Sequence, residues 1–82
     1  MSWTLAWSWV AEYRDFPALG WHAAERIAAA ILRLAATGRG PIVQIDPDDP
    51  NRFRLRIEGA EARLFLDSRA RTILVMRIYR RS

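Results

Sequence analysis

The stretch FRLRIEGAEARLFLD, residues 53–67, decides the fold of this chain of 82 residues. Apolar and polar residues alternate in it on both sides of Gly59, and a period of two is typical of strands that are buried on one face. We therefore predict strands over Phe53–Glu58 and Ala62–Asp67, joined by the turn Gly59-Ala60-Glu61. The apolar face of this hairpin is expected to carry Phe53, Leu55, Ile57, Leu64 and Leu66.

Further strands are expected on both sides of the hairpin. Thr72–Tyr79 is the most apolar run of the chain, and it predicts a central strand with apolar residues on both faces. Trp3–Ser8 alternates and contains aromatic residues, so it predicts a strand near the N-terminus. Asp46–Pro50 is a turn by its composition, and the apolar segment Ile42–Ile45 before it either follows the surface or forms a short strand.

Two helices are expected between the first strand and the hairpin. Ser8 can cap a short helix that continues to Phe16. A longer helix begins at Leu19 or Gly20 and continues to about Thr37. Residues that recur every three or four positions in it form an apolar stripe toward the core. This stripe consists of Ile27, Ile31 and Leu34.

The order strand, helix, helix, strand, strand, strand predicts a small α+β domain. In this fold class a two-helix hairpin packs on one face of a mostly antiparallel sheet, here the apolar face of the hairpin strands. A chain this short has a small core, and the absence of cysteine excludes disulfides. The four tryptophans, Trp3, Trp7, Trp9 and Trp21, are expected to pack in the core or against the helices.

The chain has no apolar run that predicts a membrane segment. Its longest candidate after the N-terminal region, Ile27–Leu32, is interrupted by Arg33 and is too short to span a bilayer. We therefore expect a cytoplasmic protein without a membrane partner. His22 is the only histidine and there is no cysteine, so neither a metal site nor a cofactor is expected.

The charge of the chain changes sign between its two halves. Residues 1–50 contain four arginines and six acidic residues, a net charge of −2, whereas residues 51–82 contain nine arginines and three acidic residues, a net charge of +6. All basic residues are arginine, which a GC-rich genome explains, but codon usage does not explain the asymmetry. A basic half of this kind indicates an anionic partner.

Strand parity places arginines and aromatic residues on the face that the helices leave open. The hairpin strands contribute Arg54, Arg56, Arg63 and Phe65. If Leu74, Met76 and Ile78 face the helices, the last strand adds Arg77, Tyr79 and Arg81. Guanidinium groups match phosphate oxygens, and aromatic rings stack on unpaired bases, so this face is expected to bind nucleic acid. The alternative is an ordinary solvated sheet face.

In order and spacing, three stretches of the chain resemble the RelE/ParE toxin superfamily. They are Arg26-Ile27 to Leu32-Arg33-Leu34-Ala35 with Gly38-Arg39-Gly40-Pro41, the hairpin residues 53–65, and residues 72–81. The resemblance covers nearly the whole chain and implies that residues 1–82 form a single toxin domain. It also implies a toxin of a type II toxin–antitoxin system, neutralised by a cognate antitoxin.

The RelE-like branch of this superfamily inhibits translation by cutting mRNA on the ribosome, as an endoribonuclease or mRNA interferase. The resemblance implies that basic residues bind the RNA and stabilise the transition state while the 2′-hydroxyl attacks the adjacent phosphate. Catalytic roles fall to Arg63, Arg81 and Tyr79, and RNA or phosphate binding falls to Arg54, Arg56, Arg77 and Phe65. Replacing Arg63 by alanine is expected to abolish toxicity while the fold survives.

The chain departs from the RelE-like branch in its acid and base groups. RelE-like nucleases usually continue beyond the last strand and carry a tyrosine, histidine or glutamate there, whereas this sequence ends at Ser82 and contains no lysine. Arginine is a poor general base because it stays protonated. Enzymatic activity is therefore an open question. The alternatives are a ParE-like inhibitor of DNA gyrase, which is not an enzyme, and a toxin-fold protein that has lost its activity.

Overall fold

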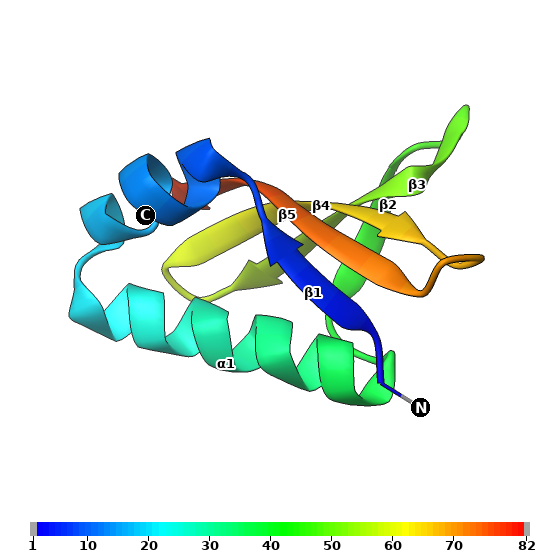
Figure 1. Ribbon diagram of the computed structural model, residues 1–82. Coiled ribbons are helices and arrows are strands. Elements are labelled where there is room, and N and C mark those ends of the chain that lie inside the picture. The colour runs from blue at the N-terminus through cyan, green and yellow to red at the C-terminus, as the bar shows by residue number, and fades with distance from the viewer. Residues whose placement is uncertain (1, 82) are drawn as a thin grey trace.

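The computed structural model describes residues 2–81, and its centre is one sheet of five strands in the order β1-β5-β4-β3-β2 (Figure 1). Neighbouring strands are antiparallel except β1 and β5, which are parallel. The mostly antiparallel sheet is thus confirmed, and segment 42–46 forms a strand that the expected order left out. The strands are β1 (Thr4–Trp7), β2 (Ile42–Asp46), β3 (Asp49–Ile57), β4 (Ala60–Asp67) and β5 (Thr72–Arg80).

Helix α1 (Trp21–Thr37) lies along one face of the sheet (Figure 1). The predicted stripe is correct, because its three residues are fully buried in the core with Leu55 and Leu64 of the hairpin. The other predicted apolar residues of the hairpin, Phe53, Ile57 and Leu66, pack against the same core. The opposite face of the sheet is left open. None of the helices described in residues 2–81 is long and apolar enough to cross a membrane.

The first helical segment is short and irregular. It consists of the π-helix η1 (Ala11–Asp15) and the 3₁₀-helix η2 (Pro17–Leu19), because proline cannot continue the hydrogen-bond ladder of η1. Ser8 caps the segment as expected, since its Oγ accepts a hydrogen bond of 3.1 Å from the N–H of Ala11. The same hydroxyl donates to the carbonyl of Met76 at 2.7 Å, which attaches the segment to β5.

A β-bulge in β5 changes the predicted parity of the last strand. Arg63 of β4 lies opposite Arg77, but the next residue, Leu64, lies opposite Val75. Met76 is therefore an extra residue that has no partner on β4. One inserted residue reverses which side chains of a strand face the core.

The expectation that Leu74 and Met76 face the helices is consequently wrong. Before the bulge, Ile73 and Val75 are fully buried and Leu74 is exposed on the open face. Beyond the bulge the predicted parity holds again, because Ile78 is buried in the core. Arg77 and Tyr79 thus reach the open face only because the bulge lies before them.

The tryptophans divide into two pairs. Trp3 and Trp7 are partly buried against the core, and Trp7 meets Phe16 edge to face with ring centroids 5.5 Å apart. Trp9 and Trp21 are 69% and 70% exposed, so the expectation of a packing role is wrong for them. Trp21 precedes Ile27, the first residue of the buried stripe, by six positions of the helix, and six steps of about 100° place its side chain about 120° away from Ile27.

Replacing Gly38 by alanine is expected to lower the free energy of unfolding by about 1–2 kcal/mol. Gly38 ends α1 with φ 72°, and an added Cβ would lie 3.1 Å from Nε1 of Trp3. Urea denaturation measures the change. Gly40→Ala is the control, because its Cβ would make an ordinary contact of 3.6 Å with Leu34. Equal stability of the two variants would contradict the expected strain.

Candidate nucleic-acid interface

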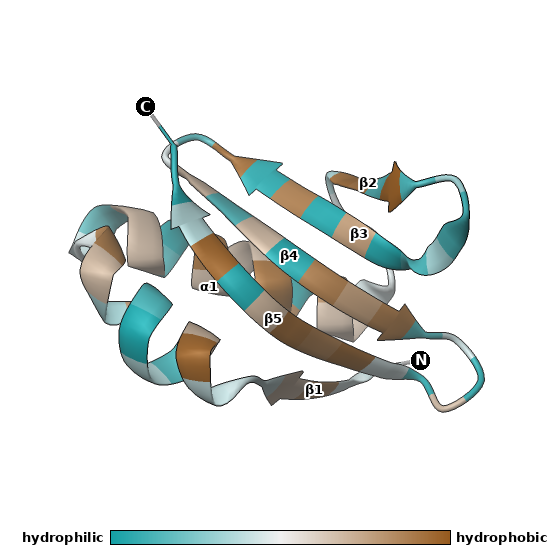
Figure 2. Ribbon diagram, turned by 90° about the horizontal axis from the view of Figure 1, so that it is seen from above, coloured by the Kyte–Doolittle hydropathy of each residue, from teal (hydrophilic) through white to brown (hydrophobic). Residues whose placement is uncertain are grey.

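Hydrophilic positions of β3, β4 and β5 lie next to one another in the view onto the open face (Figure 2). At the centre, Arg54 lies directly opposite Arg63, which lies directly opposite Arg77 on the next strand. We call these three residues the arginine row. Like charges that face each other across strands are destabilising. The row therefore requires either compensating acids or an anionic ligand.

One compensating acid is Glu61, which is buried and only 5% exposed. Its Oε1 accepts a hydrogen bond of 2.5 Å from Nε of Arg56, and its Oε2 accepts one of 2.6 Å from Nε of Arg63. Burial raises the pKa of Glu61, but the hydrogen bonds and charges of Arg56 and Arg63 outweigh it and leave the pKa below its ordinary value. Glu61 is therefore an anion at neutral pH and links two strands.

The second compensating acid is Asp15, at the end of η1. It is 8% exposed, and its carboxylate accepts hydrogen bonds of 2.8 Å from Nε of Arg77 and 3.0 Å from the N–H of Ile78. The hydrogen bond from Arg77 lowers the pKa of Asp15, against burial, which raises it. Arg77 thus fastens the N-terminal helical segment to β5, in addition to its place on the open face.

Arg54 has no such partner. Of the five arginines on the open face of residues 2–81, it is the one without a carboxylate within 4.0 Å, since Arg52 pairs with Asp49 at 3.1 Å. Its Nε is buried without a hydrogen-bond partner. Its neighbour on β2 is the uncharged Val43. The positive charge of Arg54 is therefore uncompensated at the edge of the row.

Aromatic rings flank the arginine row on both sides. The ring centroid of Tyr79 lies 5.5 Å from Cζ of Arg63 and 5.1 Å from Cζ of Arg77, within the range of cation–π contacts. On the other side of the row, Phe65 lies opposite Leu74, and both are partly exposed. Two residues along a strand span about 7 Å, so the backbone positions of Tyr79 and Phe65 lie about one such step from the row, on opposite sides of it.

Arg81 lies apart from this cluster, at the end of the sheet. Four residues beyond Arg77 correspond to about 13 Å along a strand. The backbone N–H of Arg81 donates to the carbonyl of Gly59, and its guanidinium donates to the carbonyl of Ile57 at 3.3 Å. Its side chain lines a hollow of about 370 Å³ together with residues 19–23. The structure thus brings together all the predicted site residues except Arg81.

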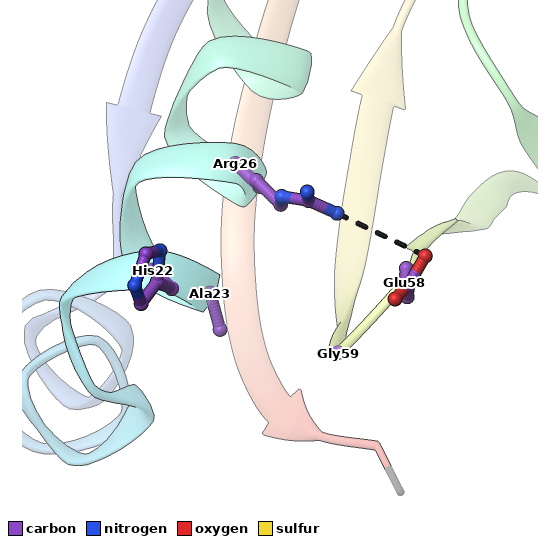
Figure 3. A pocket seen from close by; sticks show the side chains of 5 residues that line it. All are labelled: His22, Ala23, Arg26, Glu58 and Gly59. Carbon is purple, nitrogen blue, oxygen red and sulfur yellow. Dashed lines mark ion pairs between the residues drawn. The ribbon is translucent and has the colours of Figure 1, made fainter.

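A second hollow, of about 280 Å³, lies beside the first between α1 and the β3–β4 turn (Figure 3). His22 and Ala23 line it from the helix and Gly59 lines it from the turn, while Arg26 and Glu58 approach each other across it at 3.9 Å. Residues 2–81 contain no group of three or more His, Asp or Glu side chains that could hold a metal ion.

The two buried acids were missed as site residues from the sequence. Glu61 could have been found, because it precedes Arg63 by two residues and so shares its face of the strand. Asp15 could not, because its contact with Arg77 joins residues 62 positions apart and depends on how η1 packs beside β5.

Comparisons with known proteins extend the description of the fold. No protein-family model matches the sequence, and no curated protein matches it. Among solved structures, a chain of the toxin–antitoxin complex RelBE2 from Mycobacterium tuberculosis is similar, with a TM-score of 0.83 and 16% identity. The match covers 99% of this chain and 100% of that chain. At this identity the likeness concerns the fold alone, and the chain therefore has the RelE fold that the resemblance of its sequence implied.

Proposed function

We propose that the chain is the toxin of a toxin–antitoxin pair and that it acts on RNA through its open face. The observation that carries the proposal is the uncompensated charge of Arg54 in the arginine row. Two neighbouring guanidinium groups and a flanking aromatic ring suit a phosphate with an adjacent unpaired base. The RelE-like fold adds support, because a chain of this fold occurs in a toxin–antitoxin complex. A cognate antitoxin would hold the chain inactive.

More specifically, we propose that the chain cleaves mRNA on the ribosome. The 2′-hydroxyl of one nucleotide attacks the adjacent phosphorus, and the bond to the 5′ oxygen of the next nucleotide breaks. Negative charge develops on the phosphate oxygens, where Arg54 and Arg63 stabilise it. Tyr79 can donate a proton to the departing 5′ oxygen.

The acceptor for the proton of the attacking hydroxyl comes from outside this face. Glu61 and Asp15 are occupied by guanidinium groups, and their lowered pKa values make them weak bases. The arginines stay protonated. We therefore assign the acceptor to water or to a group of the ribosome. An acceptor supplied by the ribosome would account for the proposed dependence on the ribosome.

Induction of the chain in a sensitive cell is expected to stop protein synthesis while DNA supercoiling stays normal. The two are measured separately, by incorporation of a labelled amino acid and by the topoisomer distribution of a reporter plasmid. Altered supercoiling with normal early synthesis would identify a gyrase inhibitor instead. Normal growth despite full expression would identify a toxin fold without activity.

A further inference from the structure

We propose that Glu61 is a positioning residue that holds the guanidinium groups of Arg56 and Arg63 so that their remaining N–H groups meet an RNA phosphate beside Arg54. This role rests on the proposed function, because it needs an anion on the open face. Glu61 itself touches no RNA, since it is buried beneath the two guanidinium groups that it binds.

The carboxylate of Glu61 connects two strands through Arg56 and Arg63, and we call these three residues the clamp. Arg56 of β3 lies opposite Glu61 of β4. Arg63 comes two residues after Glu61 and lies on the same face of β4. Each oxygen of the carboxylate accepts a hydrogen bond from Nε of a different arginine, at 2.5 and 2.6 Å. The two guanidinium groups are thereby held at a fixed separation around one buried anion.

The clamp leaves most donors of the two arginines unused. A guanidinium group has five N–H donors, of which Nε carries one. Within residues 2–81, the side chains of Arg56 and Arg63 make hydrogen bonds to Glu61 alone, in each case through Nε. Four N–H donors on each side chain therefore have no acceptor in the protein and are available to phosphate oxygens.

Because Glu61 holds the side chains of Arg56 and Arg63 in place before a ligand arrives, it favours the binding of an anionic ligand. Arginine has many rotamers, and ordering a free arginine on a ligand costs conformational entropy. Without Glu61, repulsion from Arg54 and Arg77 would also turn the guanidinium of Arg63 toward solvent. Glu61 therefore has two opposed effects on an anionic ligand, since its charge repels the ligand while its hydrogen bonds arrange the donors.

Because the two effects of Glu61 change RNA binding in opposite directions, one substitution distinguishes them. Glu61→Gln removes the negative charge, so charge alone predicts tighter RNA binding. An amide, however, accepts from only one of the two Nε–H groups, so positioning predicts weaker binding, by about tenfold or more. The measurement is fluorescence anisotropy with a labelled single-stranded RNA that carries 2′-O-methyl groups and cannot be cleaved. Tighter or unchanged binding by folded Glu61→Gln would overturn the positioning role.

Asp49→Asn is the matched control, because it removes the carboxylate beside Arg52 of the same face. It makes the same change of charge without touching the clamp, and unchanged or slightly tighter binding is expected. Glu61→Asp is the second variant. It keeps the charge, but its side chain is too short to reach both arginines. It also serves as the test if Glu61→Gln does not fold. Binding as tight as that of the wild type by Glu61→Asp would contradict positioning.

An NMR measurement separates failure of the positioning role from failure of the proposed function. In the wild type, the Nε–H signals of Arg56 and Arg63 are expected to be protected from exchange with water, and in Glu61→Gln at least one loses protection. If the wild type does not bind RNA, the proposed function is wrong, although the protected signals persist. If it binds RNA while the signals are unprotected, only the role of Glu61 is wrong.

Discussion

Replacing Arg63 by alanine is expected to reduce toxicity at least about 100-fold while the chain still folds. Removal of one preorganised donor to a developing oxyanion typically costs 10²–10³ in rate. Arg63 is the middle residue of the arginine row, contacts Tyr79 and is held by Glu61, so its loss affects both other arginines of the row, the ring and the carboxylate at once. Its side chain is 37% exposed, and its removal leaves no cavity in the core. The lost hydrogen bond to Glu61 costs about 1–3 kcal/mol of stability.

The measurement compares growth and protein synthesis after induction of matched amounts of each variant. Arg69→Ala is the control, because Arg69 lies in the exposed turn between β4 and β5 and carries the same charge. Thermal unfolding confirms that both variants fold. Full toxicity of a folded Arg63→Ala variant would show that the open face is not the active surface.

The largest effect on stability is expected for Asp15→Asn, with a loss of about 2–3 kcal/mol in the free energy of unfolding. The carboxylate of Asp15 is buried and accepts from both Arg77 and the backbone of Ile78. An amide of the same size loses the charge and replaces one acceptor by a donor. For a chain of this size the loss is a large fraction of a total of about 4–12 kcal/mol.

Urea denaturation at neutral pH measures this difference. Asp48→Asn serves as the control, since Asp48 is exposed in the turn between β2 and β3. Equal stability of the two variants would show that Asp15 does not hold η1 against β5.

The pH dependence of stability gives an independent check on Asp15. Its pKa in the folded chain is lower than in the unfolded chain, so its contribution is complete above the unfolded value of about 4. As the pH falls from there through the folded pKa, the carboxylate is protonated and the contribution is lost. The gap in stability between the wild type and Asp15→Asn should therefore be wide at pH 7 and narrow in acid. A gap that stays constant with pH would exclude a charged Asp15.

The alternation around Gly59 and the stripe of α1 were sufficient to predict the layers of the fold. Apolar residues at a period of two or of 3.6 must find a buried surface, and Leu55, Leu64 and Ile31 do so in the core as predicted. The arginines of β3 and β4 followed from the same alternation, because the side chain next to a buried one must face outward. These features depend only on neighbours along the chain.

The tertiary structure decided which of these charges are free. The bulge at Met76 depends on the pairing of β4 with β5, and it moved Leu74 onto the open face. Asp15 compensates Arg77 across 62 positions of sequence, and the buried Glu61 is shared by two strands. Local periodicity reports only which side of a strand is buried. Which carboxylate pairs with which arginine depends on segments far apart in the sequence. In this fold, those contacts leave Arg54 without a carboxylate partner.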